Sequence, residues 1–310
     1  MNITITKPGL YLDFDPAAYL RDPCPKPSFS QSIAKVLLDQ SPAHARLAHP
    51  RLSRPDAEPQ DYNADRAIGD AAHALLLGRG KRLAVADFGD WRTAAAKLFK
   101  ADAIDEGTTP ILTHHMARAY AMVKAAREQI AEADLPELFS SDGDCEVVAA
   151  WTEDGLWCRT MIDWLGASRM VVADYKTTGM TCAPHAIEDR PSLMGWDIQA
   201  AMHERALDTL DADNAGRRAH FYINQENDPP YALSVIRISE ADLTMGRKKL
   251  GMAADIWRRC MISGEWPRYP AEVVMSRPRQ YLETKFLERE IAHDERKQRA
   301  PLAVDHFMGG

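Results

Sequence analysis

The stretch MVVADYKTTGMT, residues 170–181, carries a carboxylate and an ammonium at the end of an apolar run. Three apolar residues and an alanine lead into Asp174, Tyr175 and Lys176, a pattern that predicts a buried β-strand. A charged pair at the end of such a strand either forms a surface ion pair or belongs to a functional site. Because Asp-x-Lys is common by chance, its neighbours in the fold decide between these interpretations.

Two further strands precede this stretch. The runs CEVVAAWT (residues 145–152) and LWCRTMIDWL (156–165) are rich in β-branched and aromatic residues. Asp154 and Gly155 between them are a strong hairpin-turn signal, and the short segment 166–169 separates the second run from the third. The sequence therefore predicts a three-stranded antiparallel meander.

The two turns set the register of this meander, because side chains alternate between the faces of a sheet and opposed residues share a face. With a first turn of two residues and a second of four, the expected pairs are Glu153 with Leu156, Glu146 with Asp163, Leu165 with Met170, and Asp163 with Val172. Asp174 and Lys176 then share the face of Asp163, and Asp163 and Asp174 are diagonal neighbours roughly 7 Å apart at Cα. A second turn of another even length preserves this parity.

Four charged side chains thus converge on one surface, namely Glu146, Asp163, Asp174 and Lys176. The carboxylates repel one another unless a cation joins them, and their hard oxygen ligands suit Mg²⁺ or Mn²⁺. The pattern therefore predicts a divalent-metal site. Glu146 is either a member of this site or a charge at the edge of a strand.

The rest of the chain alternates helices with strands. The expected elements are helices at about 32–39, at 66–78 with His73 in its middle, over most of 87–140, at 192–210 and from Ser239 to about 261, with strands at 218–225 and 231–239. We expect an N-terminal extension (1–60), a catalytic domain (61–265) and a charged C-terminal tail (266–310). The predicted fold class is α/β (α+β), with a central mixed sheet flanked by helices.

Composition narrows the classes of protein. The 310 residues are 45% hydrophobic and 27% charged, as in a soluble globular protein. No apolar run is long enough for a membrane span, and the N-terminus lacks the layout of a signal peptide, so a cytoplasmic location is expected. The five cysteines are scattered without a C-x-x-C motif, which argues against a disulfide framework and against a clustered zinc site.

A net charge of −7 argues weakly against a protein coated in nucleic acid. On the helix after Ser239, however, a basic stripe is expected from residues 11 apart, namely Arg247 with Arg258 and Lys248 with Arg259. This stripe is either an ordinary solvated face or a surface that follows DNA phosphates.

These motifs together resemble the PD-(D/E)XK nuclease superfamily, which has a restriction-endonuclease-like core, and more closely its RecE-like branch, the exonuclease VIII type of phages and prophages. The order helix, three strands, helix, strand matches that core. IGDAAHALLLG resembles the branch's histidine-bearing helix, VVADYKTT its catalytic strand, and GWDIQAAMHERAL its Q-x-x-x-Y helix. The similarity covers most of residues 28–265.

The resemblance implies roles for individual residues. Asp163 and Asp174 would bind the divalent metal, with His73 as a further ligand, and Lys176 would be the catalytic lysine. Gln199 would position the catalytic strand and the substrate, and His203 stands where the motif has tyrosine. The backbone carbonyl of Tyr175, beside Asp174, is a further candidate ligand. On its own, a histidine such as His73 on an apolar helix face is more often a core residue.

The resemblance further implies an Mg²⁺-dependent exodeoxyribonuclease that digests linear double-stranded DNA from 5′ to 3′ and leaves 3′ single-stranded tails for recombination. Its implied partners are double-stranded DNA ends, other copies of the chain in a ring such as a tetramer, and a single-strand annealing protein of RecT type.

Alternatives are a Cas4-like or RecB-like nuclease, an endonuclease of the same superfamily, or a catalytically silent DNA-binding subunit. The Cas4-like enzymes carry a four-cysteine iron–sulfur cluster, for which this chain lacks the clustered cysteines. The Asp163, Asp174 and Lys176 set argues against a silent subunit.

Overall fold

A computed structural model of the protein describes residues 4–53, 62–133, 135 and 137–299. The chain divides into two units, Met1–Arg268 and Tyr269–Gly310, each described by itself. The boundary expected after residue 265 lies close to this division. The boundary expected between residues 60 and 61 lies outside the described residues.

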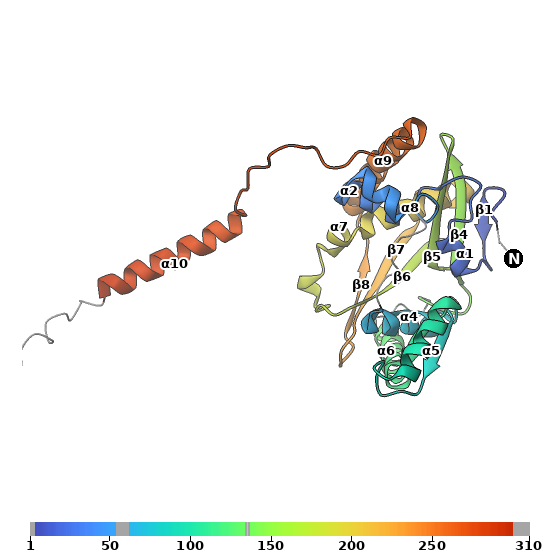
Figure 1. The fold of residues 1–310 in the computed structure, drawn as a ribbon, viewed down its shortest axis with the longest axis horizontal. Coiled ribbons are helices and arrows are strands. Elements are labelled where there is room, and N and C mark those ends of the chain that lie inside the picture. Colours follow the sequence, from blue (N-terminus) through green and yellow to red (C-terminus); the bar gives the residue numbers. More distant parts are fainter. Residues whose placement is uncertain (1–3, 54–61, 134, 136, 300–310) are drawn as a thin grey trace, which may run out of the picture. The chain divides into compact units, whose positions relative to one another are not determined.

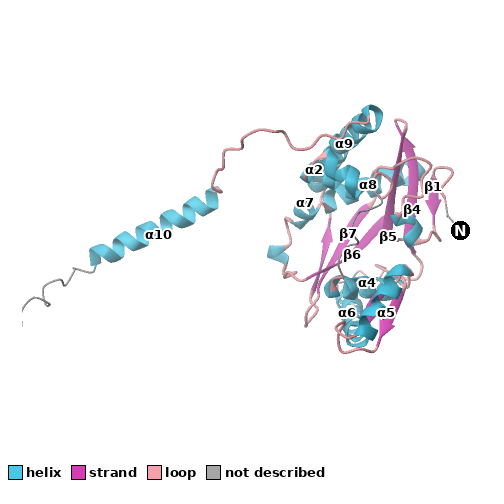
Figure 2. Ribbon diagram, viewed as in Figure 1, coloured by secondary structure: helices cyan, strands magenta, loops and turns pink. Residues whose placement is uncertain are grey.

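The elements of the first unit follow the expected alternation of helices and strands (Figure 1, Figure 2). In chain order they are β1 (Gly9–Tyr11), α1 (Pro16–Leu20), α2 (Gln31–Asp39), α3 (Pro42–Ala48), α4 (Ala64–Leu77), β2 (Leu83–Ala86), α5 (Ala94–Asp105), β3 (Thr109–Leu112), α6 (Thr113–Glu132), β4 (Asp144–Glu153), β5 (Leu156–Leu165), β6 (Val171–Thr178), a 3₁₀ turn (Pro184–Ala186), α7 (Arg190–Met194), α8 (Trp196–Leu210), a second 3₁₀ turn (Ala212–Asn214), β7 (Ala219–Glu226), β8 (Leu233–Arg237) and α9 (Glu240–Ser263). Helix α9 begins as predicted, because the Ser239 side chain accepts a hydrogen bond from the Asp242 N–H.

Among the described residues, six strands form one sheet in the order β1-β4-β5-β6-β7-β8. Strands β4, β5 and β6 form the predicted antiparallel meander, and Glu153 lies opposite Leu156 as expected. Strand β7 runs parallel to β6, which requires the crossover that α7 and α8 supply. The mixed sheet flanked by helices confirms the predicted fold class.

The expectation of a mostly helical segment 87–140 is wrong in one place. Strand β3 lies within it and pairs with β2 in a small parallel sheet. Strands of four residues are too short to show an alternating pattern, and their partners are separated by the whole of α5.

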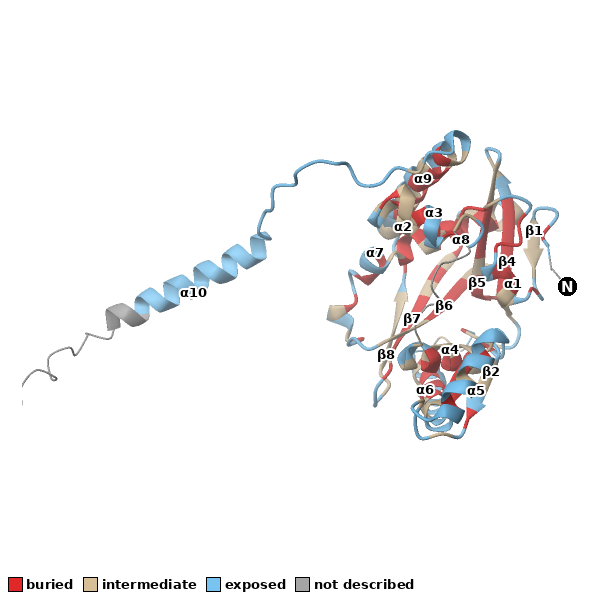
Figure 3. Ribbon diagram, in the orientation of Figure 1, coloured by how far each residue is buried: buried red, intermediate tan, exposed pale blue. Residues whose placement is uncertain are grey.

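Helices cover both faces of the large sheet (Figure 1). On one face α2, α8 and α9 pack around Trp151, Tyr222 and Trp257. On the other face α4 and α6 pack around Trp164 and Tyr175. Because the strands between these layers are largely buried (Figure 3), side chains that project from them are held in a rigid frame.

The described N-terminal residues belong to this same unit. The backbone of Phe29 forms two hydrogen bonds to β5: its N–H donates to the Trp157 carbonyl at 2.8 Å, and its carbonyl accepts from the Arg159 N–H at 2.9 Å. This segment occupies the edge of β5 that β6 leaves unpaired. The Ser41-Pro42 step also begins helix α3, with proline in the first turn, so the single helix expected here is followed by a second.

The single helix expected over 192–210 is wrong, because the chain breaks at Gly195 into α7 and α8. Gly195 has a φ of 78°, a left-handed conformation that glycine adopts at little cost. The break directs α8 across the sheet independently of α7.

Helices α8 and α9 approach closely at Gly246, where an added Cβ would lie 2.1 Å from the Asp197 carbonyl oxygen. We expect Gly246→Ala to destabilise the protein by about 1–3 kcal/mol, because overpacking against backbone outweighs the better helix propensity of alanine. Chemical denaturation measures this change. Gly251→Ala on the same helix is the control, since no atom lies within 4 Å of its added Cβ. Equal stability of the two variants would contradict the close approach.

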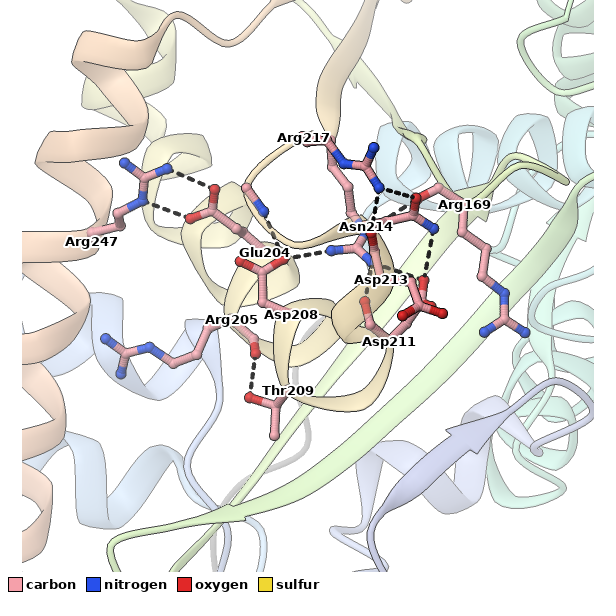
Figure 4. A network of polar contacts seen from close by, with 12 residues as sticks. Arg169, Glu204, Arg205, Asp208, Thr209, Asp211, Asp213, Asn214, Arg217 and Arg247 are labelled. Carbon is pink, nitrogen blue, oxygen red and sulfur yellow. Dashed lines mark hydrogen bonds and ion pairs between the residues drawn. The ribbon is translucent and has the colours of Figure 1, made fainter.

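A polar network joins the end of α8 to the start of β7 (Figure 4). The buried Arg218 guanidinium donates to the Asp211 carboxylate at 2.8 Å, also pairs with Asp208, and donates to the Arg169 carbonyl at 3.1 Å. It therefore ties the β5–β6 turn to α8, at the end of β6 remote from Lys176.

The second unit contains helix α10 (Gln280–Arg299). This helix lies within the charged C-terminal tail predicted for residues 266–310. Apolar side chains on it, including Phe286 and Ile291, are exposed. Across the described residues, every helix is too short or too polar to cross a membrane.

Candidate active site

The site lies where β5 and β6 separate. Their described backbone pairing consists of Trp164 with Ala173 and Leu165 with Val172. The expected pairs of Leu165 with Met170 and Asp163 with Val172 are therefore wrong by two residues. The turn is longer than expected but still even, so the parity holds and Asp163 lies opposite Asp174 rather than diagonal to it.

At this opening the Asp163 carboxylate, rather than a backbone carbonyl of β5, accepts a hydrogen bond from the backbone of β6. Its Oδ2 accepts the Tyr175 backbone N–H at 3.2 Å. Since the N–H and C=O of one strand residue point to the same side, the Tyr175 carbonyl faces this opening too, and its role as a ligand stays a prediction. The Tyr175 side chain lies on the opposite face, where its hydroxyl donates to Gln225.

Asp174 is almost fully buried and contacts two polar side chains. Its Oδ1 pairs with the Lys176 ammonium, and its Oδ2 accepts the Gln199 side-chain N–H at 2.6 Å. Burial, and then the Asp163 carboxylate, raise the pKa of Asp174 to about 6, against the opposing effect of Lys176. Gln199 thus contacts Asp174, and the positioning role that the Q-x-x-x-Y resemblance implies for it stays a prediction.

His73 reaches the same opening from α4. Its Nε2 lies 3.2 Å from Asp163 Oδ2, and its Nδ1 lies 4.0 Å from Glu146 Oε1. Burial acts to lower the pKa of His73, but Asp163 and then Glu146 raise it above its ordinary value. The structure therefore brings His73 beside Asp163 and Glu146, and the roles of His73 and Glu146 in metal binding stay predictions.

Basic side chains contact the carboxylates, with Lys176 at Asp174 and His73 at Asp163. Within the described part of the chain, no group of three His, Cys, Asp or Glu residues has the spacing of a formed metal site. The donor set nevertheless fits a hard divalent cation, because burial and the Asp163 carboxylate disfavour the ionised form of Asp174. Burial also raises the pKa of Glu146. A cation beside these oxygens would relieve both effects.

His203, at the position of the motif tyrosine, follows Gln199 by one turn of α8. It is buried, and burial lowers its pKa to about 4, so its ring is neutral at neutral pH. It bonds to the backbone of Met161 on β5, whereas Gln199 bonds to Asp174 on β6. One face of α8 thus contacts both strands that carry the carboxylates.

A cavity of about 620 Å³ opens beside these residues. His73, Glu146 and Lys176 line it, together with Thr177 and Lys81. Lys81 pairs with Asp70 at 2.9 Å, and its side chain remains partly exposed. No local pattern singles out Lys81, because it follows the end of α4 in an irregular segment. The cavity is large enough to admit a phosphodiester with its flanking groups.

Gly69 allows α4 to approach β6, since an added Cβ would lie 2.6 Å from Thr177 Oγ1. His73 follows one helical turn later on the same face. If the site hydrolyses DNA, we expect Gly69→Ala to lower the cleavage rate roughly tenfold to a hundredfold by displacing His73.

The double variant Gly69→Ala, Thr177→Ala removes the colliding oxygen and should recover the rate of Thr177→Ala alone. An unchanged rate in Gly69→Ala would show that this contact does not position His73.

The basic stripe predicted on α9 is partly neutralised. Arg247 forms a two-bond pair with Glu204, at 2.7 Å for each bond, and Arg258 pairs with Asp154 and Asp255. Intramolecular ion pairs of this kind leave little charge for phosphates. Lys248 and Arg259 are exposed, and DNA binding through them stays a prediction.

The fold and the site define the class of protein. A mixed sheet flanked by helices, with Asp163 on one strand and Asp174 and Lys176 on the next, is the arrangement of the PD-(D/E)XK class. A family model described as "PDDEXK-like domain of unknown function (DUF3799)" matches residues 73–277, and the chain belongs to this family.

The fold is also similar to that of a solved structure. The crystal structure of a protein from Eubacterium rectale described as a "putative exonuclease" aligns with a TM-score of 0.54 and 12% identity, over 83% of this chain and 92% of that one. At this identity the likeness shows the fold alone. No curated protein matches the sequence. The resemblance to the PD-(D/E)XK superfamily is thus confirmed, and the findings are consistent with its RecE-like branch.

Proposed function

We propose that the protein is a divalent-metal-dependent exodeoxyribonuclease acting on linear double-stranded DNA, with 5′-to-3′ polarity and 3′ single-stranded products. The observation that carries this proposal is the position of Asp163, Asp174 and Lys176 where β5 and β6 separate, beside a cavity that His73 and Glu146 also line. Membership of a PDDEXK-like family supports the same reaction class.

Asp163, Asp174 and His73 would hold the ion, with Glu146 beside them. A bound Mg²⁺ or Mn²⁺ supplies Lewis-acid polarisation of the phosphate and lowers the pKa of its water. Burial acts to lower the pKa of Lys176, but Asp174 and Asp163 raise it, so the side chain stays an ammonium. That ammonium can orient a water molecule and stabilise charge that develops on the phosphate oxygens.

The remaining residues orient these groups. Gln199 holds one oxygen of Asp174, and the Tyr175 N–H holds one oxygen of Asp163. Because both bonds come from rigid elements, the carboxylates need little reorganisation when substrate binds. Association of several copies in a ring, and cooperation with an annealing protein of RecT type, are part of the same proposal and rest on the family resemblance.

The proposal is tested by incubating the purified protein with linear and with closed-circular duplex DNA, in Mg²⁺ or in EDTA, beside Asp174→Ala and Lys176→Ala. We expect loss of linear DNA alone, only with Mg²⁺ and only with the unaltered chain. Blocking the 5′ or the 3′ ends tests polarity. Absence of Mg²⁺-dependent loss, or equal loss with both variants, contradicts the nuclease proposal. Attack on closed circles indicates an endonuclease.

A further inference from the structure

The backbone of the proposed catalytic lysine is held by a side chain from the neighbouring strand. Asn224 on β7 lies opposite Lys176 in the parallel register and is almost fully buried. Its side-chain amide donates to the Lys176 carbonyl at 3.2 Å. The Asn224 amide therefore adds a side-chain hydrogen bond to the backbone of Lys176, beside the β6–β7 pairing.

Arg190 sets the orientation of the Asn224 amide. This residue begins α7 and is 5% exposed, and its Nη1 donates to Asn224 Oδ1. A donor on the oxygen side of the Asn224 amide leaves the amide nitrogen directed at Lys176, because the two groups of an amide are fixed relative to each other. Arg190, Asn224 and Lys176 therefore form a chain of hydrogen bonds.

The same guanidinium also holds the segment that follows the catalytic strand. Its Nη2 donates to the Thr181 carbonyl, and its Nη1 lies 3.8 Å from Cys182 Sγ. The adjoining residues Thr178 and Gly179 line the cavity. Arg190 thus links one wall of the cavity to the strand that carries Lys176.

The partners of Arg190 are uncharged. Among the described residues, no carboxylate oxygen lies within 4.0 Å of its side-chain nitrogens, and its contacts are an amide, a carbonyl and a thiol. A buried guanidinium with neutral partners contributes less stability than a well-packed apolar residue would. The presence of a buried arginine at this position is therefore better explained by the groups that it positions than by a contribution to the stability of the fold.

We propose that Arg190 and Asn224 are a positioning pair for the nuclease reaction, which hold Lys176 and the adjoining cavity wall in register with Asp163 and Asp174. This inference rests on the proposed function. Removal of either member lets the segment around Lys176 shift, and small misplacements of a reacting group lower the rate of the chemical step more than they lower substrate affinity.

The test compares Arg190→Met, Asn224→Leu and the double variant with the unaltered protein, in Mg²⁺ with linear duplex DNA. We expect kcat to fall about tenfold or more in each single variant while KM for DNA stays unchanged. Since the two residues act through one chain of bonds, the double variant should lose no more than the more impaired single variant. Arg190→Lys keeps one donor and should recover part of the lost kcat.

Arg218→Met is the matched control, because Arg218 is also buried and bonded on several sides but lies at the remote end of β6. Arg218→Met breaks the ion pairs with Asp208 and Asp211 and should lower the melting temperature, whereas only Arg190→Met should lower kcat. Hydrogen–deuterium exchange adds a readout independent of DNA cleavage, with faster exchange expected around Lys176 only in the Arg190 and Asn224 variants.

Unchanged kcat in Arg190→Met and Asn224→Leu, or an equal loss of kcat in Arg218→Met, overturns the positioning role while the nuclease proposal stands. Additive losses in the double variant also overturn it, because they exclude a shared chain. If the unaltered protein cleaves no DNA, the proposed function fails and the positioning role fails with it. Exchange around Lys176 then still reports whether Arg190 holds this strand.

Discussion

Replacing Lys176 by methionine is expected to lower the Mg²⁺-dependent cleavage rate of linear duplex DNA by roughly a hundredfold to a thousandfold. Methionine keeps most of the apolar stem but removes the ammonium that contacts Asp174 and lines the cavity. The charge that develops on the phosphate oxygens then lacks the stabilisation that this ammonium would provide. Initial rates of nucleotide release measure the effect.

Lys249→Met is the matched control for this substitution. Lys249 is also a half-buried lysine, paired with the buried Asp197 at 2.6 Å, but it lies on α9 outside the lining of the cavity. Both variants lose an ion pair, so both should show a lower melting temperature. A similar loss of cleavage in the two variants would mean that Lys176 acts through stability rather than through chemistry.

Asp22→Asn is expected to destabilise the protein by about 3–5 kcal/mol, because it removes one partner of a buried ion pair. The Asp22 side chain is fully buried, with Oδ1 3.2 Å from Arg159 Nη1 and Oδ2 3.3 Å from His49 Nε2. Both oxygens also accept hydrogen bonds from Ser28. Asparagine turns one of these acceptors into a donor and leaves the buried Arg159 without its carboxylate.

Urea denaturation measures this change, with Asp13→Asn as the control. Asp13 also pairs with an arginine, Arg79, but its side chain is 89% exposed. An exposed pair contributes little. Comparable losses in the two variants would show that the burial of Asp22 is not what makes its ion pair important.

The pH dependence of the Asp22 contribution follows from its pKa. Burial acts to raise that pKa, but His49, Arg159 and Ser28 outweigh burial and hold it below the ordinary value of 3.8. The stabilisation is therefore fully present above pH 3.8 and is lost as the pH falls through the lower pKa of the folded state. The difference in the free energy of unfolding between the unaltered protein and Asp22→Asn should shrink as the pH falls below 3.8. A constant difference would contradict the low pKa.

Local signals in the chain predict the catalytic meander closely. The strand expected at 156–165 is β5 itself, and the one expected at 145–152 is β4 without its end residues. Hairpin chemistry and alternation act over a few residues, so they are readable in sequence. The second turn is different, because its length depends on how Gly166 and Arg169 fold back, and the expected register was displaced by two residues.

Other parts of the site depend on segments far apart in the chain. The contact of Gln199 with Asp174 follows from the break at Gly195 and the close approach of α8 to the sheet. The pairing of Arg247 with Glu204 depends on the packing of α9 on α8. A helical spacing of 11 residues places cations on one face, but it carries no information about which carboxylates lie opposite.

The amino-acid order is sufficient for the alternation that sets Asp174 and Lys176 on one face of β6, and turns of even length extend that face to Asp163. Glu146 has a φ of 52°, which departs from an extended strand, so alternation alone does not place its side chain. The amino-acid order is also sufficient for the helix that carries His73. The opening between β5 and β6, the arrival of His73 within 3.2 Å of Asp163 and the link from Arg190 through Asn224 to Lys176 arise from packing. The physical reason is the distance along the chain over which each effect acts. Turn chemistry and periodicity act between residues that are close in sequence. These contacts instead join residues that are far apart in sequence, and the packing of the whole core determines how close they come in space.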